Sequence, residues 1–166
     1  MNPPRYHSMR LRGFTLIEML IVLGIIAVLA MLAMPANLAK NQRADVAEAL
    51  RMTETIRQTI TFYYTMKLAF PEDNLQAGVP QADLLIGNNV TRIDIENGAI
   101  HITLGNKVSK ALQGKILTLR PAVVTGSPTS PISWLCGAEP PVAGMEVVGE
   151  NKTDLMPGLI PASCGR

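Results

Sequence analysis

The 166-residue chain has little of what enzymes and nucleic-acid-binding proteins usually depend on. Aromatic residues make up 4%, and the chain has only two histidines and two cysteines. It contains no phosphate-binding loop, no zinc-binding helix motif and no nucleophile elbow, and its carboxylates do not converge along the sequence. No internal repeat or low-complexity tract is present. These absences argue against an enzyme and predict neither a cofactor nor a metal site.

What the chain does have is one long apolar run near its start. Residues 13–35 read GFTLIEMLIVLGIIAVLAMLAMP, and the only charge among them is Glu18. The segment from Phe14 to Ala39 gives about 26 residues, or roughly 39 Å of helix, which is enough to cross a bilayer core. A carboxylate at membrane depth costs roughly 2.5–3.5 kcal/mol on insertion scales, so Glu18 needs a partner.

The leader in front of this run supplies a candidate partner. Residues 1–13 contain three arginines and no acid, but they lack the apolar core and cleavage site of a secretory signal. Cleavage after Gly13 would leave a new amino group on Phe14, four residues from Glu18, within one chain or beside a neighbour. A plain membrane anchor is the simpler alternative, although it would need neither the Gly13-Phe14 junction nor the acid.

The run Gly13-Phe14-Thr15-Leu16-Ile17-Glu18 and the apolar segment after it resemble the type IV prepilin signature. Type IV pili, competence pili and the pseudopilins of type II secretion share this signature, and the resemblance covers about the first 40 residues. It implies that a prepilin peptidase cleaves after Gly13 and methylates Phe14. It also implies that the chains polymerise, and that Glu18 pairs with the Phe14 amine of an adjacent subunit to set their register.

The resemblance further implies where the chain works and with what. The precursor would sit in the inner membrane of a Gram-negative bacterium, and the leader arginines favour a cytoplasmic N-terminus and a periplasmic head. An inner-membrane assembly platform with its ATPase and an outer-membrane secretin would carry it into an extracellular filament. Adhesion, twitching motility or DNA uptake would follow, with a host surface or DNA as further partners.

The rest of the sequence predicts an α+β fold of the type IV pilin kind. Apolar residues recur at helical spacing up to about Lys67, so one helix should run from the membrane segment into the head. Gly24 and Pro35 are its expected kink positions. We expect a leader (1–13), a membrane and filament-core helix (14–39) and a head (40–166). Within the head we expect a helix (40–67), a connector (68–89) pinned by residues 84–86, a sheet (90–136) and a loop (136–164).

Four antiparallel strands are expected in that sheet. Residues 90–96 and 99–104 alternate apolar and polar side chains around Asn97-Gly98, a strong hairpin signal. Residues 115–120, ending before Pro121, and residues 132–136 give the third and fourth strands. His101 falls in the second strand, where we expect an outward or edge position rather than a base.

Cys136 and Cys164, the only cysteines, both lie in the part expected outside the cytoplasm, where disulfides persist. A bridge closing about 29 residues would stabilise the fold by roughly 3.6 kcal/mol. Two unlinked thiols or half of a metal site are the alternatives, but there is no Cys-x-x-Cys and few imidazole ligands. Many type IVa pilins have a similar C-terminal cysteine pair, whereas type II pseudopilins usually lack that loop.

The charge balance bears on DNA binding. Without the leader the chain would carry 12 basic and 13 acidic residues, a net charge of −1. A basic cluster remains, which could contact DNA phosphates or a neighbouring subunit, or simply be solvated: Lys107, Lys110, Lys115 and Arg120. The sequence therefore predicts the structural subunit of a type IV pilus, with a DNA-binding competence pilin and a type II secretion pseudopilin as alternatives.

Overall fold

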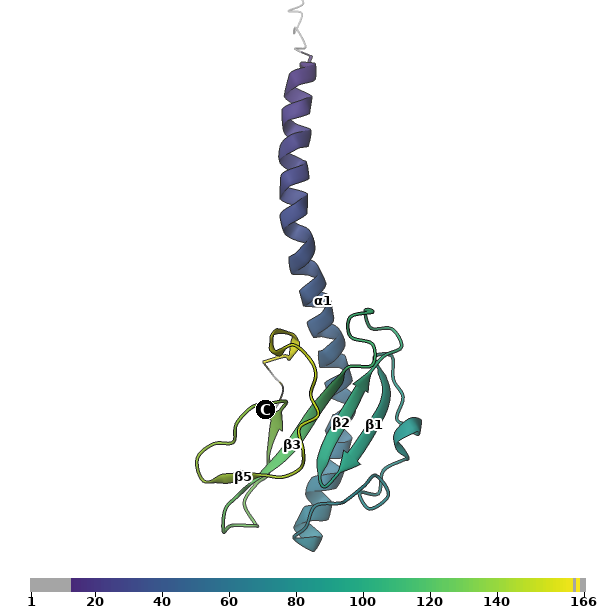
Figure 1. Ribbon diagram of the computed structural model, residues 1–166, viewed down its shortest axis with the longest axis vertical. Coiled ribbons are helices and arrows are strands. Elements are labelled where there is room, and N and C mark those ends of the chain that lie inside the picture. The colour runs from purple at the N-terminus through teal and green to yellow at the C-terminus, as the bar shows by residue number, and fades with distance from the viewer. Residues whose placement is uncertain (1–12, 163, 165–166) are drawn as a thin grey trace, which may run out of the picture. The chain divides into compact units, whose positions relative to one another are not determined.

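The computed structural model describes residues 13–162 and Cys164, except for the side chains of residues 32–37. The chain divides into two compact units, residues 1–38 and 39–166. Helix α1 (Leu16–Lys67) contributes to both. The sheet and all other elements belong to the C-terminal unit (Figure 1).

In the N-terminal unit, α1 begins directly after Thr15. Large apolar side chains lie on all sides of this part of the helix, and those of residues 14–31 are exposed. Among the described residues, no helix is both long enough and apolar enough to cross a membrane. The expected membrane segment, residues 14–39, includes positions 32–37, whose side chains lie outside the description.

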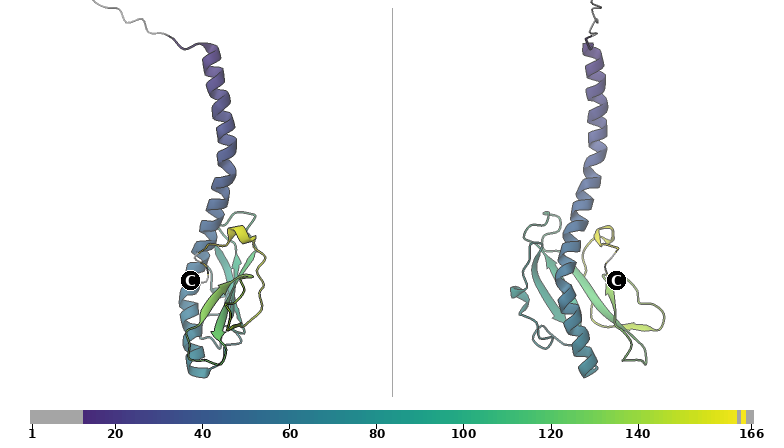
Figure 2. Two further views of the ribbon diagram at one scale, coloured as in Figure 1. Left: turned by 90° about the vertical axis from the view of Figure 1, so that its left-hand side faces the viewer. Right: turned by 180° about the vertical axis from the view of Figure 1, so that it is seen from behind.

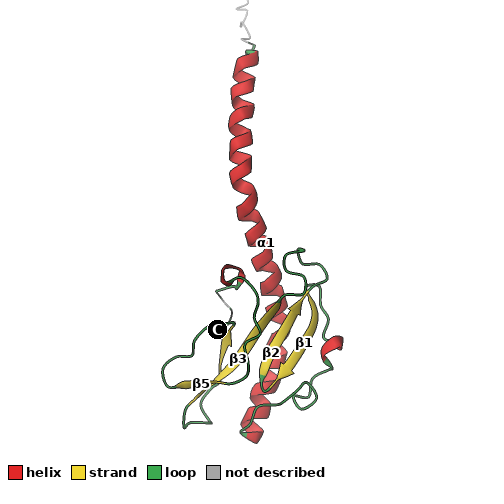
Figure 3. Cartoon of the chain, in the orientation of Figure 1, coloured by secondary structure: helices red, strands yellow, loops and turns green. Residues whose placement is uncertain are grey.

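The C-terminal unit is an antiparallel sheet packed on the second half of α1 (Figures 2 and 3). Its strands follow in the order β1-β2-β3-β4, and a fifth strand, β5, pairs with β3. The bounds are β1 Val90–Glu96, β2 Ala99–Leu104, β3 Ile116–Val124, β4 Ser133–Cys136 and β5 Met145–Val147. Two short 3-10 turns, Ala82–Leu84 and Pro157–Leu159, complete the unit. The expected α+β fold, a long helix packed on an antiparallel sheet, is confirmed.

One apolar core joins α1 to the sheet. Val46, Ala49, Ile56 and Ile60 recur at helical spacing on α1 and are buried against alternate residues of the central strands. The strand side of this core comprises Val90, Ile93, Ile95, Ile100, Ile102, Leu104, Leu117, Leu119, Trp134 and Cys136. Because the core uses one face of the sheet, the opposite face is free to carry polar side chains.

The β1–β2 hairpin forms at the pair that the sequence indicated. Asn97 and Gly98 both have positive φ, 49° and 82°, as a tight hairpin turn between twisted strands requires. Gly98 is also needed for space, since a Cβ built there would lie 2.7 Å from the Cβ of Phe70. The turn thus fixes the hairpin and also docks the segment that follows α1.

The structure corrects three expectations about this unit. β3 does not end before Pro121 but continues to Val124, and β5 was not predicted. Pro121 is paired with Trp134 of β4, but its carbonyl accepts from Val148, so its nitrogen faces the other edge of β3. Proline is tolerated because on that edge β2 pairs only as far as Leu119 and β5 only from Ala122. Residues 84–86 do not pin the connector as a patch, since Leu84 and Ile86 are exposed and only Leu85 packs on the core.

Candidate functional site

The start of α1 brings together the residues that sequence reasoning assigned to processing and assembly. Gly13 and Phe14 precede the helix without regular secondary structure, and Phe14 is 73% exposed. Glu18 lies in the first helical turn and is the only charged residue in positions 13–38. An acid in this turn is also favoured by the partial positive charge at the helix N-terminus.

Glu18 has a local role that sequence reasoning missed. Its backbone N–H donates to the Thr15 hydroxyl at 3.3 Å, and its carboxylate accepts from the Thr15 N–H at 3.5 Å. This reciprocal arrangement is a capping box, which satisfies two backbone donors that the first turn leaves without helical partners. The signal was present in the sequence as Thr-x-x-Glu at positions 15–18. Glu18 therefore has a partner within its own chain before any second subunit is present.

The two expected kink positions differ in what is described. A Cβ added at Gly24 would meet no atom within 4 Å, so packing within this chain does not require glycine there. Pro35 lies within the bounds of α1, but its side chain is outside the described residues. Kinking at both positions stays a prediction.

The expected disulfide joins Cys136 to Cys164, with their Cα atoms 5.8 Å apart. Cys136 ends β4 and is buried, whereas Cys164 is half-buried against the same core. In the described part of the chain, no group of three or more histidine, cysteine, aspartate or glutamate side chains could hold a metal ion. The bridge encloses β5 and the long segment that follows it.

Part of that enclosed segment, residues 148–154, crosses β3 and is called the strap here. At one end the Val148 N–H donates to the carbonyl of Pro121 at 2.9 Å. At the other end Asp154 exchanges two bonds with the backbone of Ile116: its N–H donates at 3.1 Å, and its carboxylate accepts at 2.6 Å. Figure 1 shows this segment passing in front of β3, with α1 behind the sheet.

Asp154 anchors the strap by charge as well. Its carboxylate lies 3.0 Å from the Lys115 ammonium. Partial burial alone would raise the pKa of Asp154, but the Ile116 N–H and the Lys115 ammonium together hold that pKa below its ordinary value. The ionised form is therefore the one that ties the strap to β3.

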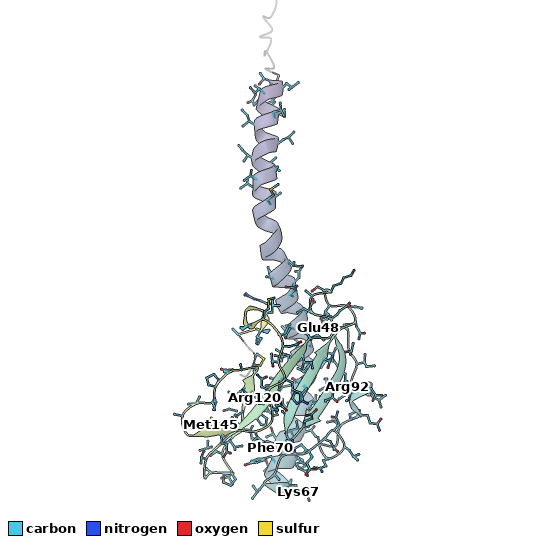
Figure 4. The ribbon with its side chains drawn as sticks, in the orientation of Figure 1. Glu48, Lys67, Phe70, Arg92, Arg120 and Met145 are labelled. Atoms are coloured by element: carbon cyan, nitrogen blue, oxygen red, sulfur yellow. A yellow bond between two sulfur atoms is a disulfide. The ribbon has the colours of Figure 1, made fainter. Side chains whose placement is uncertain are left out.

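The basic cluster expected from the sequence is split by the fold. Lys115 is engaged with Asp154, and Arg120 donates to the carbonyls of Gly137 at 2.9 Å and Glu139 at 3.1 Å (Figure 4). Lys107 and Lys110 lie on the loop between β2 and β3 and are exposed. Of the four residues in the basic cluster, only Lys107 and Lys110 are therefore available to contact DNA or a neighbouring subunit.

His101 points to the outward face of the sheet, as expected, but it is buried there. It is 3% exposed, on the sheet face opposite the α1 core, with Nδ1 3.0 Å from the Thr118 hydroxyl. Burial lowers the pKa of His101 below its ordinary value, and the nearby Lys152 ammonium lowers it further, against the opposing influence of Glu96. The strap is what buries this face, and nothing in the β2 sequence indicates it.

Comparison with known proteins gives matches to both units. A family model described as pilin (bacterial filament) matches residues 42–165, and a model of the prokaryotic N-terminal methylation motif matches residues 8–34. The type IV major pilin protein PilE of Neisseria gonorrhoeae is 37% identical over 127 residues, covering 76% of this chain and 74% of its own. Another N. gonorrhoeae protein, type IV major pilin protein PilE1, is 35% identical over 162 residues, with 92% and 86% covered. The fimbrial protein EcpC of Eikenella corrodens is 34% identical over 132 residues, with 76% and 82% covered.

Proposed function

Because the chain belongs to the type IV pilin family, we propose that cleavage after Gly13 is the switch that lets it polymerise. The chain is a structural pilus subunit, made as a membrane precursor and assembled into an extracellular filament. Cleavage creates an amino group on Phe14, which is then methylated. Glu18 of an incoming subunit pairs with that amine and fixes the axial register as its helix leaves the membrane.

The position of Glu18 carries this proposal. It is the single charge in a stretch of exposed apolar side chains, and it stands four residues from the amine that cleavage would create. In the filament, the apolar side chains of residues 14–31 would be covered by the same segments of neighbouring subunits, in an environment where an ionised carboxylate needs a cation. Before assembly, the capping box reduces the cost of keeping Glu18 in the membrane. On assembly, the pair with the neighbouring amine replaces part of the capping box.

The substitution Glu18→Gln separates the two roles of this side chain. Glutamine also fits the last position of a capping box, so the helix start is kept while the negative charge is lost. We expect normal membrane insertion and normal cleavage, but at least a tenfold lower yield of sheared surface filaments. Glu139→Gln makes the same chemical change at an exposed position of the C-terminal unit and should leave the yield unchanged.

A companion variant tests the cap alone. Thr15→Val removes the hydroxyl that accepts from the Glu18 N–H and should weaken the helix start by about 1 kcal/mol. Filament yield near that of the unchanged chain in Thr15→Val, together with loss in Glu18→Gln, would assign the assembly defect to the charge. Normal piliation by Glu18→Gln would refute the registration role.

The wider setting follows from the same role. The partners would be a prepilin peptidase that also methylates Phe14, an inner-membrane platform with an assembly ATPase and an outer-membrane secretin. The precursor would have its N-terminus in the cytoplasm and its C-terminal unit in the periplasm of a Gram-negative bacterium. Adhesion or twitching motility fits a subunit related to major pilins, and the C-terminal disulfide loop favours a pilin over a type II secretion pseudopilin.

A further inference from the structure

The outward face of the sheet holds a buried polar cluster that has no part in the proposed assembly step. His101 on β2 and Thr118 on β3 are opposite each other in the strand register, and both are buried although they point away from the apolar core. The strap covers them. Gly149 lies so close to β2 that a Cβ added to it would be 2.5 Å from the Cβ of Ala99.

Hydrogen bonds connect this cluster to the strap at its centre. The Thr118 hydroxyl accepts from the Lys152 N–H at 3.0 Å and lies 3.0 Å from His101 Nδ1. The Thr118 N–H in turn donates to the Thr153 hydroxyl at 2.9 Å. With a neutral imidazole, Thr118 accepts from the strap and donates its proton to Nδ1, which places the ring proton on Nε2.

A second proton on the imidazole does not fit this arrangement. Nδ1 would become a donor, so Thr118 would lose the acceptor for its own proton while facing two N–H groups. Nε2 carries a proton in both forms and is buried without a hydrogen-bond partner among the described atoms, with the Glu96 carboxylate 4.0 Å away. The added charge therefore gains no hydrogen bond there. The cluster is therefore built for the neutral ring.

The charged groups around His101 do not compensate for this. Glu96 is held by the Lys152 ammonium at 2.6 Å, and Asp94 by the Arg92 guanidinium at 2.6 Å (Figure 4). Lys152 repels a charged imidazole from the strap side, while Glu150, also on the strap, attracts it. Both β1 carboxylates that face His101 thus already have a cation.

We propose that the strap is an acid-sensitive latch: protonation of His101 releases residues 148–154 from the outward face of β3. The disulfide and the bonds of β5 keep the rest of the segment attached, so the change is a local opening and not unfolding. This inference concerns the surface of the C-terminal unit and does not depend on how the subunit polymerises.

The direction of the pH effect follows from linkage. The closed strap holds His101 with a lowered pKa, so the closed state is fully favoured above the ordinary histidine value of about 6.5 and is lost as the pH falls below it. If the closed state binds no proton, the opening constant rises by up to about 30-fold between pH 7.5 and pH 5.0. If the closed state does bind a proton, the opening constant rises less, by an amount set by how far the pKa of His101 is lowered in the closed state.

Hydrogen exchange of the full chain in detergent micelles, followed by NMR, tests the latch. After correction for the intrinsic pH dependence of exchange, protection of the Lys152 and Asp154 amides should fall from pH 7.5 to pH 5.0, by at most about 30-fold. Protection of the β2 amides should stay within twofold. His101→Gln should abolish the pH dependence, and His7→Gln, the same change at the other histidine, should retain it.

Two results would overturn the proposal. One is equal corrected protection of the strap at both pH values in the unchanged chain, and the other is a pH dependence that survives His101→Gln. Should that variant fail to fold, the imidazole titration of the unchanged chain decides. The midpoint of His101 must lie below the ordinary histidine value of about 6.5 and track the loss of strap protection, and a midpoint at or above that value contradicts the latch.

Discussion

The two units of this chain differ in how far their apolar side chains are buried within the chain. In the C-terminal unit, side chains such as Ile60, Ile93 and Ile102 are fully buried against one another within a single chain. In the N-terminal unit, Leu16, Leu23 and Leu29 are 60–79% exposed. The C-terminal unit buries its apolar core within one chain. The N-terminal unit also has an apolar surface, but no described residue of the same chain covers it.

The apolar side chains of the C-terminal unit are therefore stabilised within the chain, whereas those of the N-terminal unit depend on the medium around it. A core substitution in the C-terminal unit acts on folding, because transfer from water to that core is what stabilises it. A substitution on the N-terminal helix acts on the environments outside the chain, first lipid and, in our proposal, then the helices of neighbouring subunits. The same substitution made in each unit should therefore have different effects on the stability of the C-terminal unit.

The largest separation is expected from matched core and helix truncations. Ile60→Ala should lower the free energy of unfolding of the C-terminal unit by about 2–5 kcal/mol, since it removes a fully buried side chain. Ile26→Ala, the same change at a 55% exposed position of the N-terminal unit, should alter it by less than about 0.5 kcal/mol. Urea unfolding in detergent, followed by the fluorescence of Trp134, measures both. Similar losses for the two variants would break the comparison.

The disulfide should have the next largest effect, again confined to the C-terminal unit. Replacing Cys136 and Cys164 together by serine should cost roughly 3.6 kcal/mol in the chain-entropy account. The same urea titration gives the value, with chemical reduction of the unchanged chain as an independent comparison. Stability equal to that of the unchanged chain would show that the strap and β5 alone hold the enclosed segment.

A smaller, pH-dependent effect is expected at the strap anchor. The pKa of Asp154 is lowered in the folded chain, so its contribution is present above the ordinary aspartate value and is lost as the pH falls through the lowered one. Asp154→Asn should cost about 1 kcal/mol at pH 6, given that the group is half-exposed, and this difference should shrink towards pH 3. A constant difference between the two chains from pH 6 to pH 3 would contradict the ionic anchor.

The smallest effect is expected for DNA. Only Lys107 and Lys110 of the basic cluster are exposed without a described ion pair, and the mature net charge is −1, so binding of the processed chain to duplex DNA should be weak. Replacing Lys107 and Lys110 by glutamine should change it less than twofold at 150 mM salt. Tight, salt-sensitive binding that the double variant abolishes would instead favour the competence-pilin reading.

Sequence alone predicted those parts of the fold in which a local pattern matches the structure. The alternation of residues 90–104 around Asn97-Gly98 and the helical recurrence from Val46 to Ile60 each indicate both an element and its buried face. β5 was not predicted because its three residues, with Glu146 exposed in the middle, are too few to show the alternation of apolar and polar residues that indicates a strand. The continuation of β3 was not predicted because Pro121 is tolerated only by the gap between β2 and β5 on the edge that its nitrogen faces.

The candidate sites likewise differ in whether their residues are close in sequence or are brought together only by folding. Gly13, Phe14 and Glu18 form a contiguous motif, so they could be assigned from sequence, and the Thr15 cap could have been read from the same residues. The burial of His101 could not, because it depends on a strap that returns across β3 from much later in the chain. The basic cluster also failed to hold together, since Lys115 and Arg120 found partners that only folding brings near.

The central claim is that the N-terminal unit becomes competent for assembly only when cleavage gives Glu18 a partner amine. Intact mass measurement of the protein in sheared, washed surface filaments tests it most directly. Our account predicts a chain of residues 14–166 with one added methyl group on Phe14 and two hydrogens fewer for the disulfide. Filaments built from chains that still begin at Met1 would contradict it.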